Sequence, residues 1–168
     1  QNTVAIIDRT TNQIVYADID FALGPHGTYM IPGDYPGGDN LMMFDNGYVG
    51  EWYLRTRDDA RVWETNPVYN WRPFQYYAQN SGLRRGSFYS HIEGGAQRLP
   101  NGNTLITAGT WVVGQRTHIF EVTPDWRRVW EVRLPILKKS GRSVGVYNSQ
   151  RMIPPLTGEL IALTSASC

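Results

Sequence analysis

Cysteine is almost absent from the 168-residue sequence, since the only one is Cys168, the last residue. An internal disulfide therefore cannot form, and Cys168 either pairs with another chain or stays a free thiol. The three histidines are widely spaced, and no short cluster of metal-binding side chains matches a usual zinc spacing. Phosphate loops, nucleophile elbows and dinucleotide fingerprints are missing too. We therefore predict that the chain binds neither a metal nor a cofactor.

Charge of one sign is also lacking, because the formal net charge is only +1. The basic residues that cluster form three short pairs of the kind found in solvated loops, Arg84-Arg85, Arg127-Arg128 and Lys138-Lys139. This balance gives no electrostatic basis for binding nucleic acid. No apolar run approaches the roughly 20 residues of a membrane-spanning helix, so we expect no membrane span. Because the sequence opens at Gln1 rather than Met, we expect a processed product or a piece of a longer chain.

Sustained 3.6-residue periodicity is absent as well, and this excludes a high helix content. Glycine and proline are frequent, with 17 and 10 residues, and aromatic residues make up 12% of the chain. Frequent turns between aromatic-rich runs are typical of short strands. We therefore predict an all-β fold and a single domain over residues 1–168.

An outer hairpin element occurs three times along the chain. Each copy is a short β-rich run, a polar turn and a second β-rich run. The copies span residues 4–16, 61–74 and 118–131. Asp8, Glu64 and Glu121 end the first run of each copy and mark a repeat of about 56 residues.

An inner hairpin element lies after each outer one. Its copies span residues 29–44, 97–107 and 150–163. The middle copy has Asn101-Gly102 between two β-rich runs, which is a strong hairpin signal. Two hairpins per repeat give four strands, which is the build of a β-propeller blade. A β-sandwich also uses short strands and frequent turns, but sandwiches do not usually repeat at this period.

The order of the hairpins predicts an open half-disc. The chain begins with an outer hairpin and ends with an inner one, so a third blade exists only if residues 148–167 pair with an outer hairpin like 4–19. Propellers close with about 4–8 blades, so we predict about three four-stranded β-propeller blade equivalents, half of a six-bladed disc. The strand edges at both ends are then covered by a second copy in a homo-oligomer or by the remainder of a longer chain.

Four motifs occur in an order that is known from one family of propellers. They are Gly24-Pro25-His26-Gly27, Phe44-Asp45-Asn46-Gly47, the run from Gly94 to Ile106, and Tyr147-Asn148-Ser149-Gln150-Arg151. Together they resemble the C-terminal half of the arylsulfotransferase family, and the resemblance covers essentially the whole chain.

The resemblance implies a secreted or periplasmic protein, usually six-bladed. Members of the family move a sulfuryl group from an aryl sulfate to a phenol through a sulfated histidine, without a nucleotide donor. The expected partners are therefore aryl sulfate or phenolic small molecules. In the family, other histidine and asparagine residues of the pore come from upstream blades, which lie outside this sequence.

His26 is the strongest candidate for a catalytic residue. A neutral imidazole is a competent nucleophile near pH 7, and the resemblance makes His26 the residue that is sulfated. His91 occupies the equivalent approach to the next inner hairpin, where it can bind a sulfate oxygen or protonate a leaving phenolate. Tyr89, two residues before it, is a candidate for substrate binding. The alternative role of His26 is a loop histidine that only hydrogen-bonds a turn.

Two arginines precede the prolines of inner hairpins. We expect Arg151 to point to the pore and to hold a sulfate, because a guanidinium binds such an anion with two hydrogen bonds. Arg98 either contacts substrate in the same way or braces neighbouring blades. Asn46 either makes a secondary substrate contact or shapes the turn after its strand. Glu93 would repel an aryl sulfate unless it is protonated.

Two other functions stay open from the sequence. One is a non-catalytic propeller that binds a ligand or a partner on its disc face. The other is a structural protein in which open half-propellers associate through their strand edges. Convergence of His26, Arg151 and another polar group on one cavity would favour the enzyme.

Overall fold

The computed structural model of the chain describes residues 3–19, 22, 24–47, 60–68, 70–77, 90, 93–109, 116–136, 144–152 and 160–164. All regular elements in these ranges are strands, which confirms the prediction of an all-β chain. Within the same ranges, no helix has the length and apolar character needed to cross a membrane.

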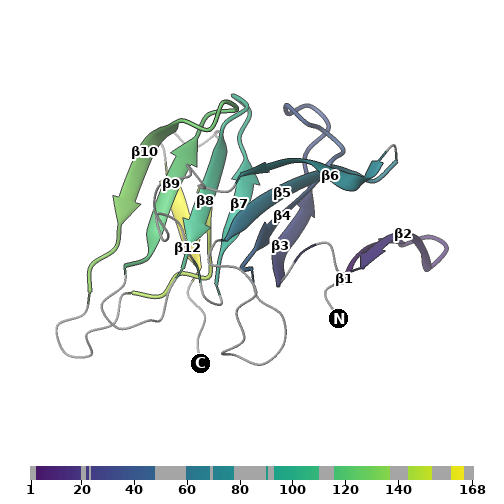
Figure 1. Cartoon of the computed structure of the whole chain (residues 1–168), viewed down its shortest axis with the longest axis horizontal. Coiled ribbons are helices and arrows are strands. Elements are labelled where there is room, and N and C mark those ends of the chain that lie inside the picture. Colours follow the sequence, from purple (N-terminus) through teal and green to yellow (C-terminus); the bar gives the residue numbers. More distant parts are fainter. Residues whose placement is uncertain are drawn as a thin grey trace.

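Twelve strands follow one another as six hairpins (Figure 1). The first six are β1 (Thr3–Asp8), β2 (Gln13–Ile19), β3 (Pro25–Met30), β4 (Leu41–Asp45), β5 (Arg61–Asn66) and β6 (Asn70–Tyr77). The other six are β7 (Gly95–Arg98), β8 (Thr104–Ala108), β9 (His118–Val122), β10 (Arg128–Arg133), β11 (Asn148–Met152) and β12 (Leu160–Thr164). Every hairpin expected from the repeat is present in the predicted place.

The hairpins combine into two complete sheets and two isolated pairs. The first sheet has the order β3-β4-β5-β6 and the second has the order β7-β8-β9-β10, with all neighbours antiparallel. The pairs β1-β2 and β11-β12 form separate two-stranded sheets. Figure 1 shows the two four-stranded sheets side by side, with the purple β1–β2 hairpin far from the yellow β12.

Strand β4 is buried on both faces because it lies between two cores. Leu41 and Met43 belong to a core that the first sheet shares with the β1–β2 hairpin. Met42 and Phe44 belong to a core that the first sheet shares with β8 and β9. Side chains alternate across a strand, so an uninterrupted apolar run is needed to fill both sides.

Strand β8 has the same position in the second sheet. Ile106 and Ala108 point into the core shared with the first sheet, whereas Leu105 belongs to a third core that includes Val146, just before β11. Successive sheets therefore bury apolar faces against each other along the chain. This face-to-face packing brings the first strands of the sheets together.

The register of the repeat corrects one sequence interpretation. The β1–β2, β5–β6 and β9–β10 ladders each shift once, directly after Ile6, Glu64 and Glu121 respectively. This shared bulge makes Ile6, and not Asp8, the equivalent of the two glutamates. The expectation that Asp8 marks the repeat is wrong.

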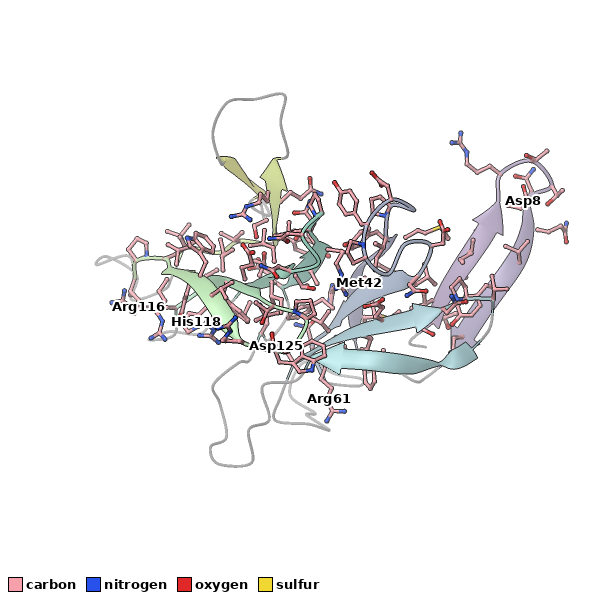
Figure 2. The ribbon with its side chains drawn as sticks, turned by 90° about the horizontal axis from the view of Figure 1, so that it is seen from above. Asp8, Met42, Arg61, Arg116, His118 and Asp125 are labelled. Atoms are coloured by element: carbon pink, nitrogen blue, oxygen red, sulfur yellow. The ribbon has the colours of Figure 1, made fainter. Side chains whose placement is uncertain are left out.

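Asp8 has a local role in a turn. Its Oδ1 accepts hydrogen bonds from the backbone N–H groups of Thr10, at 2.7 Å, and Thr11, at 3.3 Å. Figure 2 shows Asp8 at the outer tip of the β1–β2 hairpin, turned away from the sheets. A short carboxylate that binds its own turn is common in hairpin loops, which explains why it misled the alignment of the repeat.

Candidate functional site

Three of the candidate site residues lie on leading strands, β3, β7 and β11, each the first strand of its sheet or pair. Strand β7 contacts both β3 and β11, so the three strands lie next to one another although they are far apart in sequence. His26 lies on β3, Arg98 on β7 and Arg151 on β11. The fold therefore gathers these sequence candidates on adjacent strands.

His26 is half-buried and is the second residue of β3, so it lies within a strand and not in a loop before it. Its Nδ1 is 3.3 Å from the hydroxyl of Tyr147, and the two rings meet edge to face. Burial lowers the pKa of His26 and outweighs the nearby carboxylate of Asp45, which raises it. The imidazole is therefore mostly neutral at pH 7.

Two adjacent glycines let the leading strands approach closely beside His26. A side chain on Gly94 would collide with the ring of Phe44 from the first sheet. A side chain on Gly95 would collide with the amide of Asn148 on β11. Gly94 also has a φ of +155°, which residues with a side chain rarely adopt. Both glycines are thus required by packing from the two neighbouring elements.

Asn46 connects the first sheet to the segment that leads into β7. Its amide nitrogen donates to the backbone carbonyls of Ser90, at 2.7 Å, and Glu93, at 3.2 Å. The side chain is fully buried. Its neighbour Asp45 accepts a hydrogen bond from the Gly47 N–H at 2.9 Å and so shapes the turn after β4. These contacts fit the turn-shaping alternative for this pair of residues.

Arg98 spans the junction between the first and second sheets. Its guanidinium lies 2.5 Å from the carboxylate of Glu64 on β5 and also donates to the Gly102 carbonyl at 2.9 Å. The other oxygen of Glu64 accepts a 2.7 Å hydrogen bond from Asn40. Arg98 is only 6% exposed, so this guanidinium is committed to an ion pair in the interior. We name the set of Asn40, Glu64 and Arg98 the first bridge.

Arg151 takes part in an equivalent second bridge, formed with Asn103 and Glu121. Its guanidinium lies 3.0 Å from one carboxylate oxygen of Glu121 on β9. Asn103 donates to the other oxygen at 2.5 Å. The second bridge joins the second sheet to the β11–β12 pair as the first bridge joins the two sheets. Arg151 is thus occupied by an acidic partner, although the sequence suggested a sulfate ligand.

A second contact repeats at both junctions. The Arg98 N–H donates to the hydroxyl of Tyr29, and the Arg151 N–H donates to Oε1 of Gln97, at 2.5 and 2.8 Å. Tyr29 and Gln97 hold the same position on their leading strands, directly before the residue that pairs with the start of the next strand. Sequence inspection missed this role because tyrosine and glutamine share no motif.

The other candidate residues, the nearby Glu93 and the third histidine, His118, do not gather at one place in the described residues. His91 and Tyr89 lie outside the described residues. Glu93 is buried directly before Gly94. His118 lies on β9, and its Nδ1 is 3.7 Å from Glu131. No group of three or more metal-binding side chains occurs in the described ranges.

A hollow of about 480 Å³ lies between β1 and β3. It is lined by both polar and apolar atoms of Thr3, Val4, Ala5, Ile6, Ile7, Thr28, Tyr29, Met30 and Leu41. It borders the edge of β1 that does not pair with β2. No described strand pairs with that edge.

Comparison with known proteins gives no match to any family model, curated protein or solved structure.

Proposed function

We propose that the two sheets and the two hairpins are blades and half-blades of a β-propeller. The repeated bridges carry this proposal, because equal contacts at successive junctions relate each sheet to the next by a similar rotation. Similar rotations between consecutive four-stranded sheets arrange them around an axis. The leading strands β3, β7 and β11 would then line that axis.

We further propose arylsulfotransferase-like chemistry at His26, with an aryl sulfate as donor and a phenol as acceptor. The observation that carries this proposal is the neutral, half-buried imidazole of His26 beside the Tyr147 hydroxyl. In the productive tautomer, Nδ1–H donates to the Tyr147 oxygen, which leaves the lone pair of Nε2 available for attack. A neutral imidazole with one free nitrogen is a nucleophile at pH 7.

The proposed reaction has two balanced transfers. In the first, His26 Nε2 forms a bond to sulfur while the bond from sulfur to the aryl oxygen breaks, and its electron pair leaves with the phenolate. In the second, the oxygen of an acceptor phenol attacks the same sulfur, the N–S bond breaks and its electron pair returns to Nε2. The acceptor's proton passes to the departed phenolate or to solvent. Consistent with the family resemblance, we propose a secreted or periplasmic setting.

A variant at His26 tests the chemistry. We expect the wild-type protein to transfer sulfate from a chromogenic aryl sulfate to a phenol, and His26→Ala to lower the rate by about 10³-fold or more, because the covalent route is lost. His118→Ala is the control, since His118 lies on β9 beside Glu131, and it should keep the wild-type rate. A wild-type protein without turnover, or full turnover in His26→Ala, would contradict the proposal.

A second candidate function is a non-catalytic propeller that binds a ligand or assembles with partners. The observation that favours it is the use of both Arg98 and Arg151 as bridges, which leaves neither guanidinium for an incoming sulfate. A wild-type protein that binds a phenol or an aryl sulfate but never turns it over would support this candidate.

A further inference from the structure

We infer that the free edge of β1 binds a second copy of this chain, whose β12 pairs with it and completes a four-stranded blade. The inference rests on the blade arrangement proposed above and does not depend on sulfuryl transfer. The composite blade would have the order β11-β12-β1-β2, with the first two strands from one copy and the last two from the other. Two copies related by a two-fold axis would form two such blades.

The two isolated hairpins are complementary halves of a blade. In each complete sheet, an inner hairpin precedes an outer one, and the second strand pairs with the third, as β4 does with β5 and β8 with β9. The β11–β12 pair has the position of an inner hairpin after the second sheet, and β1–β2 has that of an outer hairpin before the first. Within the described residues, neither hairpin pairs with a second one, and each has the form of the half that the other lacks.

The hollow beside β1 marks the place of the missing hairpin. At the two formed junctions, β4 lies against β7 and β8 lies against β11, so the second strand of one sheet covers the leading strand of the next. The equivalent strand at the junction before β3 would fill the space between β1 and β3. That space is the hollow of about 480 Å³.

Two large apolar side chains are exposed at positions that are buried in the complete sheets, Met30 at the junction before β3 and Ile7 on the opposite face of β1. Ile7 is 58% exposed, whereas Thr65 and Val122, which follow the bulge residue in the two complete sheets, are 0% and 1% exposed. Met30 is 47% exposed, whereas the equivalent Arg98 is 6% exposed. Large apolar side chains exposed at positions that are elsewhere buried mark an interaction surface.

The sequence at this junction fits an apolar seam. Ile6 stands where the complete sheets have the bridge glutamates, and Met30 stands where the next leading strands have the bridge arginines. Both charged partners are thus replaced together by apolar residues. Loss of only one would leave a buried charge without a partner, which is strongly destabilising. The paired change indicates a junction that is buried when it is complete.

The complete sheets also define the register of the seam. Glu64 pairs with Met42, and Glu121 pairs with Leu105. Ala162 is equivalent to both partners, because it pairs with Gln150 on β11 as Met42 pairs with Tyr29 and Leu105 with Gln97. Ile6 should therefore pair with Ala162 of the second copy, and Ala5 with Leu163.

A second copy is the occupant that this register favours. Two complete sheets and one composite blade per copy give a six-bladed disc, within the range of about 4–8 blades that closed propellers use. The free edges of β1 and β12 are then covered at once in both copies, so these two edges leave no place for a third chain. A copy that paired at one end only would leave an open edge for further addition.

Disulfide trapping tests the register. In a Cys168→Ser background, the pairs Ile6→Cys with Ala162→Cys, and Ala5→Cys with Leu163→Cys, are placed in one chain. Neighbouring antiparallel pairs alternate between wide and narrow spacing, so at least one of the two should oxidise to a covalent dimer. The control is Ile7→Cys with Ala162→Cys, whose side chains would point to opposite faces, and it should stay monomeric on a non-reducing gel.

Each result decides for or against the inference. A covalent dimer from an in-register pair, with none from the control, supports it. Monomer in all three variants, a disulfide within one chain, or a ladder of larger polymers would overturn it. Dimers that do not turn over an aryl sulfate would contradict only the proposed chemistry. Turnover by a monomer would contradict only this inference.

Amide hydrogen exchange of the wild-type protein tests the same inference without any variant that could fail to fold. In an edge strand, only every second amide is hydrogen-bonded, whereas a central strand uses all of them. Successive amides of β1 should therefore resist hydrogen exchange as those of β5 and β9 do. Fast exchange at every second residue of β1 would overturn the inference.

Discussion

His26 shows how the surroundings set the charge of a single residue. Its imidazole is half-buried on β3, and desolvation of the charged form lowers its pKa more than Asp45 raises it. A nucleophile must keep an unprotonated nitrogen, so this shift favours the chemistry proposed for it. Local sequence offers no sign of the shift, because Tyr147, which lies against the ring, is far away in the chain.

The first prediction is that His26 titrates below its ordinary value of 6.5. Because its folded pKa is lower than its unfolded pKa, the stability contributed by the neutral ring is complete above pH 6.5 and is lost as the pH falls through the folded pKa. Titration of the ring protons by NMR measures the midpoint directly. His118, whose pKa is also lowered by burial, is the internal comparison.

Two outcomes bear on this prediction. In urea, where the chain is unfolded, both histidines should titrate close to 6.5, and this serves as the control. A midpoint for His26 at or above 6.5 in the folded protein would show that Asp45 outweighs burial. A midpoint above 7 would also make the protonated ring the main form at pH 7 and would contradict the neutral nucleophile.

At the scale of secondary-structure elements, the two bridges are the polar contacts that join neighbouring sheets. In the first bridge the side chains of Arg98 and Glu64 are 6% and 4% exposed, and Asn40 donates a hydrogen bond to the second carboxylate oxygen of Glu64. A buried ion pair of this kind adds less stability than its short distance suggests, because both charges have lost their water. It instead fixes how the second sheet docks on the first, since a shifted sheet would separate the charges.

The second prediction concerns removal of one or both partners of the first bridge. Arg98→Met and Glu64→Gln alone should each lower the free energy of unfolding by about 3–5 kcal/mol, because one polar partner stays buried. The double variant should cost clearly less than the sum of the two changes, by about 1–3 kcal/mol. Urea unfolding followed by tryptophan fluorescence measures all three variants.

The second bridge provides a matched comparison. The Arg151 side chain is 20% exposed, so water can replace part of its lost contact, and Arg151→Met should cost less than Arg98→Met. Additive single changes at the first bridge would contradict the view that Glu64 and Arg98 act as a unit. An equal loss for both arginines would contradict the role of burial.

Hairpins were predictable from the sequence, whereas their partners across the junctions were not. Asn101-Gly102 and the β-rich runs around it specify a local turn, so their effect is visible within a few residues. The ion pair of Arg98 with Glu64 spans a long stretch of chain and depends on how two sheets dock. Asp8 was selected because it is the carboxylate closest to the expected spacing, whereas the shift in the β1–β2 ladder after Ile6 is a feature of strand pairing.

At the scale of the whole molecule, two hairpins of the described residues stay outside the four-stranded sheets. The β1–β2 hairpin and the β11–β12 pair form separate two-stranded sheets, and Figure 2 shows the purple hairpin apart from the yellow pair. The repeat predicted these two hairpins because the order of outer and inner hairpins can be read from the sequence. The apolar seam became visible only from the exposure of Met30 in the folded chain.

The particle mass of the wild-type chain tests the central claim, a propeller closed by two copies, most directly. Sedimentation equilibrium over a range of concentrations should give a single species of twice the 19.1 kDa of one chain. Closure at two seams also predicts that no larger species appears as the concentration rises, because no strand edge of the described hairpins stays open. A particle of 19.1 kDa at every concentration, or a series that keeps growing, would contradict the account.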